Sequence, residues 1–261
     1  MFADQAPYSQ FNLVRDMLAA ADAIQAFDPS VVKTTAAEIA SVGKLLFTGE
    51  GSSRLFPAKS AIRHSRQQGW ATTLHTEAGR QSQDYALADW AVLGMSNSGR
   101  TAEVIRLFTS LKVAGHSKRY SLTAAADSPL EALANRGHVL ACGKEGAVAA
   151  TKTVVEQALF CRALVESMAG HESLAPRLAR LAEQVRTALH YAMKDKPPNR
   201  PGRSDKREAS HQRPTSSQFK KRVPKNAPTE RPMALTLTKQ PEVSARETRQ
   251  TFLVIALAQA F

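Results

Sequence analysis

The sequence predicts an α/β fold, a three-layer sandwich in which helices flank a five-stranded parallel sheet. Five short apolar segments alternate with longer segments of helical periodicity. Strands that alternate with helices are typical of parallel sheets, and right-handed crossovers then give a doubly wound sandwich. The first and third apolar segments also end in turns rich in glycine, serine and threonine. Such turns predict a ligand site at the carboxyl edge of the sheet.

Each predicted strand is a short apolar run bounded by turn-forming residues, the pattern of a strand buried on both faces. The five strands are LLFT (45–48), ATTL (71–74), AVLGM (91–95), RYSLT (119–123) and HVLAC (138–142). AVLGM has the clearest pattern of the first three.

The helices are predicted from apolar residues that recur at helical spacing. Residues 11–27 form the first helix, and Ser30 is expected to cap a second that runs to about residue 42. Gly115 is expected at the end of the helix over 101–115. The remaining helices are expected up to about residue 68 and over 130–135, 148–168 and 175–191.

Length and composition exclude several classes of protein. The chain has 261 residues, and its 43% hydrophobic content suffices for a sizeable core. Cys142 and Cys161 are too few for a disulfide framework, and no His, Cys, Asp or Glu cluster has metal-ligand spacing. The first residues lack the basic start and apolar stretch expected of a signal peptide, and no apolar run approaches the roughly 20 residues needed to span a bilayer. We therefore expect a soluble, cytoplasmic protein with no metal, cofactor or membrane partner.

Positive charge is concentrated near the C-terminus. The net charge is +12, but residues 194–261 carry 15 basic and 6 acidic residues, against 20 and 17 in residues 1–193. Eight of the 13 prolines also follow residue 193. We therefore divide the chain into a domain at 1–193 and a basic, proline-rich tail at 194–261, whose segment 194–231 has too few large apolar side chains to fold.

The favoured interpretation of the tail is a disordered, solvated extension. One alternative is a basic arm that binds nucleic acid through its phosphates. Another is that the tail departs from a longer parent, for example through a shifted reading frame. A nucleic-acid partner is not expected, because the excess charge lies in the tail and not in the domain.

The two turns have the composition of a phosphate site. In GEGSSR (49–54) and SNSGRT (96–101), glycines allow close backbone approach or positive φ, and hydroxyls offer donors. The second turn leads into a helix N-terminus, which favours an anion. Neither turn is a Walker A motif or a dinucleotide fingerprint. The alternative is that the hydroxyls only cap helices and the glycines only form turns.

Three segments in order resemble the sugar isomerase (SIS) domain, a phosphosugar-binding family, and are most similar to the isomerase half of glucosamine-fructose-6-phosphate aminotransferases. GSS (51–53) resembles a Gly-Thr-Ser loop of that family, SNSGRT its Ser-Gln-Ser-Gly-Glu-Thr loop, and EGAVAATKT (145–153) its Glu-Ile-Gly-Val-Ala-Ser-Thr-Lys stretch. The resemblance covers about residues 40–170. It implies a flavodoxin-like parallel sheet and a hexose or amino-hexose phosphate as the ligand.

By the same resemblance, seven residues are expected to bind the sugar phosphate. They are Ser96, Ser98 and Thr101 at the phosphate, Asn97, Ser52 and Ser53 around the pocket, and Val148 through its backbone. Two residues depart from the family pattern. Arg100 replaces a glutamate, where it either adds positive charge near the phosphate or points to solvent. Arg54 replaces a tyrosine, which changes the surroundings of the far end of the sugar.

The sequence does not identify a catalytic base. Aldose–ketose interconversion requires a group that moves a proton between adjacent carbons. Glu156 and Lys152 are four residues apart on a predicted helix, where they either face the pocket together or form an ordinary ion pair. Glu145 lies nearer the ligand by resemblance, with orientation as its expected task. Glu50 and Glu77 lie in or near strand-end loops and remain candidates.

Two functions fit these observations. The first is an aldose–ketose isomerase of the SIS family that acts on a hexose or amino-hexose phosphate. The second is a non-catalytic phosphosugar-binding regulator, or an inactive fragment, because the second SIS half that supplies acid and base residues in two-domain members is not recognisable after residue 193. We also expect a homo-oligomer, most simply a dimer, because SIS pockets are commonly completed by a neighbouring domain or subunit.

Overall fold

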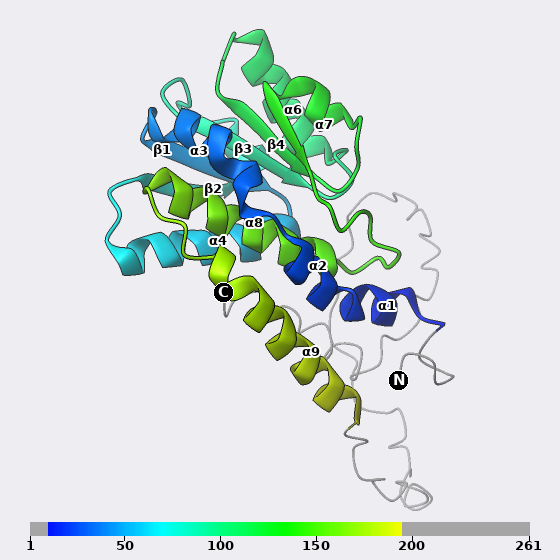
Figure 1. Cartoon of the computed structure of the whole chain (residues 1–261). Helices are drawn as coiled ribbons and strands as arrows, with labels where there is room; N and C mark the ends of the chain where they lie inside the picture. The colour runs from blue at the N-terminus through cyan, green and yellow to red at the C-terminus, as the bar shows by residue number, and fades with distance from the viewer. Residues whose placement is uncertain (1–9, 195–261) are drawn as a thin grey trace, which may run out of the picture.

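The computed structural model describes residues 10–194, which contain one five-stranded sheet (Figure 1). The strands are β1 (Lys44–Gly49), β2 (Thr73–Ala78), β3 (Ala91–Ser96), β4 (Arg119–Thr123) and β5 (Arg136–Val139). All pairings are parallel, and the strand order is β2-β1-β3-β4-β5. The predicted α/β fold is therefore confirmed. The predicted tail lies outside the described residues apart from its first residue, which ends the last helix.

Helices cover both faces of the sheet (Figure 1). One face carries α2, α3, α4 and α8, and the other carries α5, α6 and α7, while α9 packs against α2. The helices are α1 (Asn12–Leu18), α2 (Ala20–Ala26), the 3-10 helix η1 (Pro29–Val32), α3 (Lys33–Ala40), α4 (Ser52–Gln68), α5 (Gly79–Ser82), α6 (Ala102–Val113), α7 (Pro129–Leu133), α8 (Lys152–Met168), the 3-10 helix η2 (Ala175–Arg177) and α9 (Leu178–Lys194).

Strand β1 shows how the core is divided between the two faces. Leu45 and Phe47 pack in the larger hydrophobic cluster, with residues of α4 and α8, whereas Leu46 packs in the smaller cluster, with residues of α6. Successive side chains of a strand point to opposite faces. Since helices cover both faces of the sheet, all three residues are fully buried. A strand covered on both sides needs apolar residues throughout, which is why the central strands read as continuous apolar runs.

The strand order places a switch point between β1 and β3. The chain leaves β1 through α4 toward β2 on one side, and leaves β3 through α6 toward β4 on the other. The loops that follow β1 and β3 therefore diverge from neighbouring strand ends, which is where open parallel sheets bind ligands.

The two edge strands differ most from their predicted bounds. Strand β2 spans 73–78 instead of 71–74 and alternates between exposed and partly buried positions near its start. Strand β5 spans 136–139 instead of 138–142. The Leu140 N–H still donates to the Thr123 carbonyl at 2.8 Å, and beyond it the Glu156 carboxylate, and not β4, accepts the N–H groups of Ala141 and Cys142, both at 2.7 Å.

Three helix predictions also need correction. The predicted helix over 11–27 is two helices that meet at Ala19. Asp28, and not Ser30, caps η1: its carboxylate accepts the Ser30 N–H at 2.9 Å and the Ser30 hydroxyl at 2.7 Å. The helix predicted from residue 148 begins at Lys152. By contrast, Gly115 has φ +70° just beyond α6, the left-handed conformation expected at a helix end.

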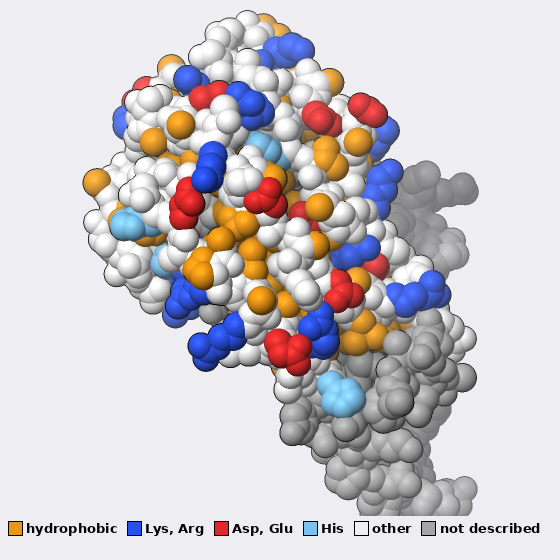
Figure 2. All heavy atoms as spheres, viewed as in Figure 1, with side chains coloured by type: hydrophobic (Ala, Val, Ile, Leu, Met, Phe, Trp, Pro, Cys, Tyr) orange, Lys and Arg blue, Asp and Glu red, His pale blue; other side chains and the backbone are white. Residues whose placement is uncertain are grey.

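Charge of both signs is mixed on the face of the domain formed by α2, α3 and α9. Figure 2 shows basic and acidic side chains interspersed there, so that this face carries no single-sign stripe of the kind that tracks nucleic-acid phosphates. Within residues 10–194 no helix combines the length and apolar character needed to cross a membrane.

A buried carboxylate joins the end of α8 to its neighbours. Glu166 is 1% exposed and pairs with Arg162 on the same helix. It accepts the N–H groups of Ser173 at 2.9 Å and Leu174 at 3.0 Å, and it lies 3.4 Å from His64 on α4. Burial and the Arg162 charge lower the pKa of His64, which Glu166 only partly opposes. Glu166 thus holds α4, α8 and the segment leading to α9 together.

We expect Glu166→Ala to lower the free energy of unfolding by about 3–5 kcal/mol, because Arg162 is only 8% exposed and would lose the carboxylate that compensates its charge. Denaturant unfolding followed by circular dichroism measures the loss. Glu183→Ala is the control, because Glu183 on α9 pairs with Arg186 at an exposed site and should cost no more than about 1 kcal/mol. Equal losses for the two variants would contradict the assignment.

Candidate functional site

The loop after β3 carries most of the predicted site residues and is organised by its own hydroxyls. Ser96, the last residue of β3, is 2% exposed, and its hydroxyl lies 2.7 Å from that of Thr101. The Ser98 hydroxyl accepts the N–H of Arg100 at 3.2 Å. Thr101 is the N-cap of α6, so these bonds place the loop against a helix N-terminus. The first N–H groups of a helix have no partner within the helix and favour an anion.

Gly99 allows this loop to pack against the loop that follows β4. It has φ +62°, and an added Cβ would lie 2.3 Å from the Ser128 side chain. The Gly99 carbonyl accepts the N–H of Leu130 at 3.1 Å, and the Asn97 carbonyl accepts that of Ala124 at 3.0 Å. The two loops therefore form one continuous surface at the carboxyl edge of the sheet.

A cavity of about 360 Å³ opens at this surface. Its lining comes from the loops after β3, β4 and β5: Asn97, Ser98, Arg100, Ala124, Ala125, Ala126, Ser128, Lys144, Glu145, Ala147 and Val148. One part of the wall is polar and cationic, and another consists of alanine and valine side chains. The volume lies in the range of small-molecule sites.

The charges of this cavity are predominantly positive. The exposed side chains of Arg100 and Lys144 have no carboxylate partner within the part of the chain that the structure describes. Glu145 is the one acidic residue of the lining, and its carboxylate is engaged by the start of α8. The cavity therefore offers two uncompensated cations beside a helix N-terminus, which suits an anionic ligand.

Glu145 caps α8 and does not point a free carboxylate at the cavity. It accepts the N–H groups of Thr151 at 2.6 Å and Thr153 at 2.9 Å, and both threonine hydroxyls as well. The Thr153 hydroxyl also accepts a hydrogen bond from the side-chain N–H of Asn97 at 2.9 Å. The side-chain oxygen of Asn97 in turn accepts one from the side-chain N–H of Gln157 at 3.0 Å. These bonds connect the loop after β3 to α8, and the orienting task expected of Glu145 stays a prediction.

Glu156 and Lys152 form neither arrangement proposed for them from the sequence. The Glu156 carboxylate binds the backbone after β5, as described above, and Lys152 lies 3.4 Å from Asp16 of α1. They do not pair with each other, and neither lines the cavity. The i, i+4 spacing was misleading because each side chain has a nearer partner in another segment.

Glu50 and Glu77 also hold backbone in place. Glu50 accepts the N–H of Gly79 at 2.9 Å, which ties the loop after β1 to α5. Glu77 accepts the N–H of Ala78 at 2.8 Å and the Tyr85 hydroxyl at 3.2 Å. The Ala78 N–H lowers the pKa of Glu77 despite its partial burial. Neither residue lines the cavity.

The loop after β1 lies beside the site. An added Cβ on Gly49 would lie 2.6 Å from the Met95 carbonyl oxygen, the close approach that the sequence predicts at the switch point. Gly51 has φ +56° and precedes α4, whose first residues are Ser52 and Ser53. These two serines are partly buried and do not line the cavity.

The seven predicted binding residues thus fall into three groups. Asn97, Ser98 and Val148 line the cavity, Ser96 and Thr101 lie within the same loop and bond to each other, and Ser52 and Ser53 stand apart from the lining. Sequence reasoning missed Lys144, Ser128 and the alanines at 124–126. The signal available for the last two was their position directly after the fourth strand, at the edge where the other loops gather.

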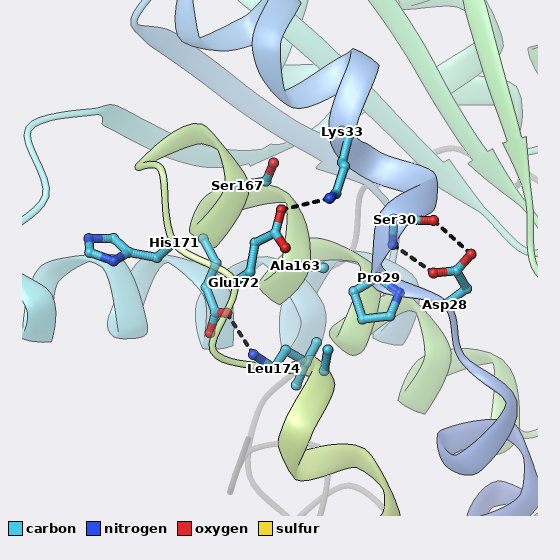
Figure 3. A pocket seen from close by; sticks show the side chains of 11 residues that line it. Asp28, Pro29, Ser30, Lys33, Ala163, Ser167, His171, Glu172 and Leu174 are labelled. Atoms are coloured by element: carbon cyan, nitrogen blue, oxygen red, sulfur yellow. Dashed lines mark hydrogen bonds and ion pairs between the residues drawn. The ribbon is translucent and has the colours of Figure 1, made fainter.

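A second cavity, of about 130 Å³, lies between η1 and the end of α8 (Figure 3). Its charges are already paired: Lys33 with Glu172 at 2.8 Å, Asp28 with Ser30, and Glu166 with Leu174. The larger cavity, with its unpaired cations, is therefore the better candidate site. Among residues 10–194 the His, Cys, Asp and Glu side chains form no group of three or more suited to holding a metal ion.

We expect Gly99→Ala to destabilise the domain more than Gly115→Ala. Both glycines have positive φ, so both variants carry the backbone strain of about 1–2 kcal/mol. Only at Gly99 does the new methyl also meet Ser128, since nothing lies within 4 Å at Gly115. Thermal and denaturant unfolding of the two variants measure the difference. Equal destabilisation would show that the two loops are not in the contact described here.

No protein-family model and no curated protein matches the chain. Solved structures do. A Silicibacter pomeroyi protein provisionally named a phosphosugar isomerase aligns over 71% of this chain and 58% of its own, with 20% identity and a TM-score of 0.58. The C-terminal domain of glucosamine-fructose-6-phosphate aminotransferase from Francisella tularensis aligns over 70% of this chain and 55% of its own, with 13% identity and a TM-score of 0.51.

The chain therefore spans a little over half the length of these two structures. At these identities the likeness is one of fold, and it covers about 70% of this chain in both cases. The chain has the sugar isomerase (SIS) fold that the resemblance of its loops predicted.

Proposed function

We propose that this chain binds a phosphorylated sugar in the cavity at the carboxyl ends of β3, β4 and β5. The observation that carries the proposal is that Arg100 and Lys144, which have no carboxylate partner among residues 10–194, line one cavity, and that Arg100 directly precedes Thr101, the N-cap of α6. A phosphate monoester carries a charge of about −1.5 to −2 at neutral pH and presents acceptor oxygens, which such a set of donors matches.

The phosphate end is assigned to the loop after β3. The Ser98 hydroxyl accepts the Arg100 N–H and keeps its own proton for a ligand oxygen. Ser96 and Thr101 hold the loop in shape through their mutual bond, and they are proposed to bind the phosphate once it replaces that bond. In this proposal Arg100, which replaces a glutamate of the family pattern, adds positive charge near the phosphate and does not point to solvent.

The sugar end is assigned to the opposite part of the cavity. Asn97, Ser128 and the backbone around Val148 offer hydrogen bonds there, and the alanines after β4 provide an apolar wall. Ser52 and Ser53 lie outside the cavity lining, so their proposed contact applies to a sugar that extends toward β1. A hexose or amino-hexose phosphate is the proposed ligand class. The names of the two similar structures, a phosphosugar isomerase and an aminotransferase of fructose 6-phosphate, support this choice.

Binding is tested by thermal unfolding with fructose 6-phosphate and glucosamine 6-phosphate. We expect the melting temperature to rise, since a ligand at 100 times its Kd adds about 2.7 kcal/mol of stability. Unphosphorylated fructose and glucosamine should have no effect. The absence of a shift with either hexose phosphate would contradict the proposal.

Arg100→Ala and Lys144→Ala should each weaken binding roughly tenfold, the loss of one charge-assisted hydrogen bond. Arg106→Ala is the matched control, because Arg106 is exposed on α6 and does not line the cavity. Isothermal titration with fructose 6-phosphate measures the three affinities. Wild-type affinity in both cavity variants would contradict the proposed position of the phosphate beside Arg100 and Lys144.

Two functions follow from such binding, catalysis by an aldose–ketose isomerase or regulation without turnover. The isomerase is supported by the SIS fold and the matched loops. The regulator is supported by the carboxylates, because Glu50, Glu77, Glu145 and Glu156 all bind backbone N–H groups and none is free in the cavity. A coupled isomerisation assay separates the two, since binding without turnover identifies the regulator. The expected dimer also remains part of the proposal.

A further inference from the structure

The wall of the cavity formed by residues 144–148 is held from a helix near the start of the chain. The Asp16 carboxylate on α1 accepts the N–H groups of Gly146 at 2.7 Å and Ala147 at 2.8 Å. Asn12, one turn earlier, donates its side-chain amide to the Gly146 carbonyl at 2.9 Å. Ala147 and its neighbour Val148 line the cavity. A contact across some 130 residues of sequence therefore determines where this wall lies.

Asp16 is suited to this task because it is buried and remains ionised. It is 7% exposed, and Lys152 at the start of α8 lies 3.4 Å from it. Burial by itself would raise the pKa of Asp16, but the N–H groups of Ala147 and Gly146, with smaller contributions from Glu145 and Lys152, outweigh burial and lower it. The carboxylate is therefore charged at neutral pH and binds both N–H groups strongly.

Two other carboxylates also bind the segment between β5 and α8, but the N–H groups that they bind lie at its ends. Glu156 binds the N–H groups of Ala141 and Cys142 at its start, and Glu145 binds those of Thr151 and Thr153 at its end. Both of these carboxylates belong to the segment itself or to α8. In the described structure, the carboxylate that holds the middle comes from α1, which lies outside the resemblance at 40–170.

We propose that Asp16 is a positioning residue of the ligand cavity, which holds Gly146 and Ala147 so that the 144–148 wall is preformed before a ligand binds. The inference rests on the proposed phosphosugar binding and adds α1 to the site. Without Asp16, the two ends of the segment stay anchored while its middle moves, so that a ligand has to order the wall when it binds and affinity falls.

Asp16→Asn is the main test, because the amide keeps the size of the side chain but loses the negative charge that strengthens both bonds, which share one carboxylate oxygen. We expect the N–H groups of Gly146 and Ala147 to exchange faster with deuterium in the free protein, while those of Ala141 and Cys142 keep their protection. The Kd for fructose 6-phosphate should rise roughly tenfold or more. Asp22→Asn is the matched control, because Asp22 lies on α2 and pairs with Arg186 at an exposed site.

Asn12→Ala is a second variant in case Asp16→Asn unfolds the domain. Asn12 is exposed and contributes one hydrogen bond to the same wall, so a smaller rise in both exchange rate and Kd is expected. A merely structural role predicts a lower melting temperature with unchanged Kd, and that result would overturn the inference. Unchanged exchange at Gly146 and Ala147 would overturn it as well. If the wild-type protein binds no hexose phosphate, the proposed function itself fails, and the inference fails with it.

Discussion

The segment between β5 and α8 has no regular secondary structure, and carboxylates bind its backbone N–H groups. Glu156 accepts two of them at the beginning and Asp16 two in the middle, while Glu145 accepts that of Thr151 at the end, together with that of Thr153 in α8. The pKa of Asp16 is lowered, and hydrogen bonds to an ionised acceptor are stronger than those between neutral groups. Carboxylates therefore do here what a ladder of neighbouring strands does elsewhere in the sheet, and the cavity takes its shape from them.

This use of carboxylates determines the electrostatics of the site. The acidic side chains at the carboxyl edge of the sheet face backbone N–H groups, whereas Arg100 and Lys144 stay unpaired among the described residues. A cavity with uncompensated cations attracts anions, and the start of α6 adds to that preference. The same arrangement leaves no free base in the cavity lining, so affinity for a phosphate and capacity for proton transfer are separate properties of this site.

The central part of the fold was predictable from the sequence because burial on both faces demands apolar runs. Strands β3 and β4 were predicted almost to the residue. The edge strands were placed less well, because β2 and β5 are partly exposed and their residues are mixed in character. The backbone just beyond β5 is held by Glu156, fourteen or fifteen residues further along the chain, and no local pattern signals such a contact.

The candidate site was predictable to the extent that its residues lie in motifs. The loop 96–101 was singled out by its glycine and hydroxyl residues, whereas Val148 was named only through the resemblance of 145–153 to the SIS family. Lys144 carries no such mark, since a single lysine is common at any surface, and Ser128 could have been found only from its position after the fourth strand. The pairing of Lys152 with Asp16 instead of Glu156 was beyond prediction, because it depends on how α1 packs against the start of α8.

The contact between α1 and the cavity wall bears on where this domain can be cut. A fragment of residues 40–170 would contain all five strands and every motif that resembles the SIS family. It would lack Asn12 and Asp16, together with the apolar faces of α2 and α3 that cover α8. Boundaries drawn from the motifs alone would therefore uncover part of the core and remove the side chains that bind Gly146 and Ala147.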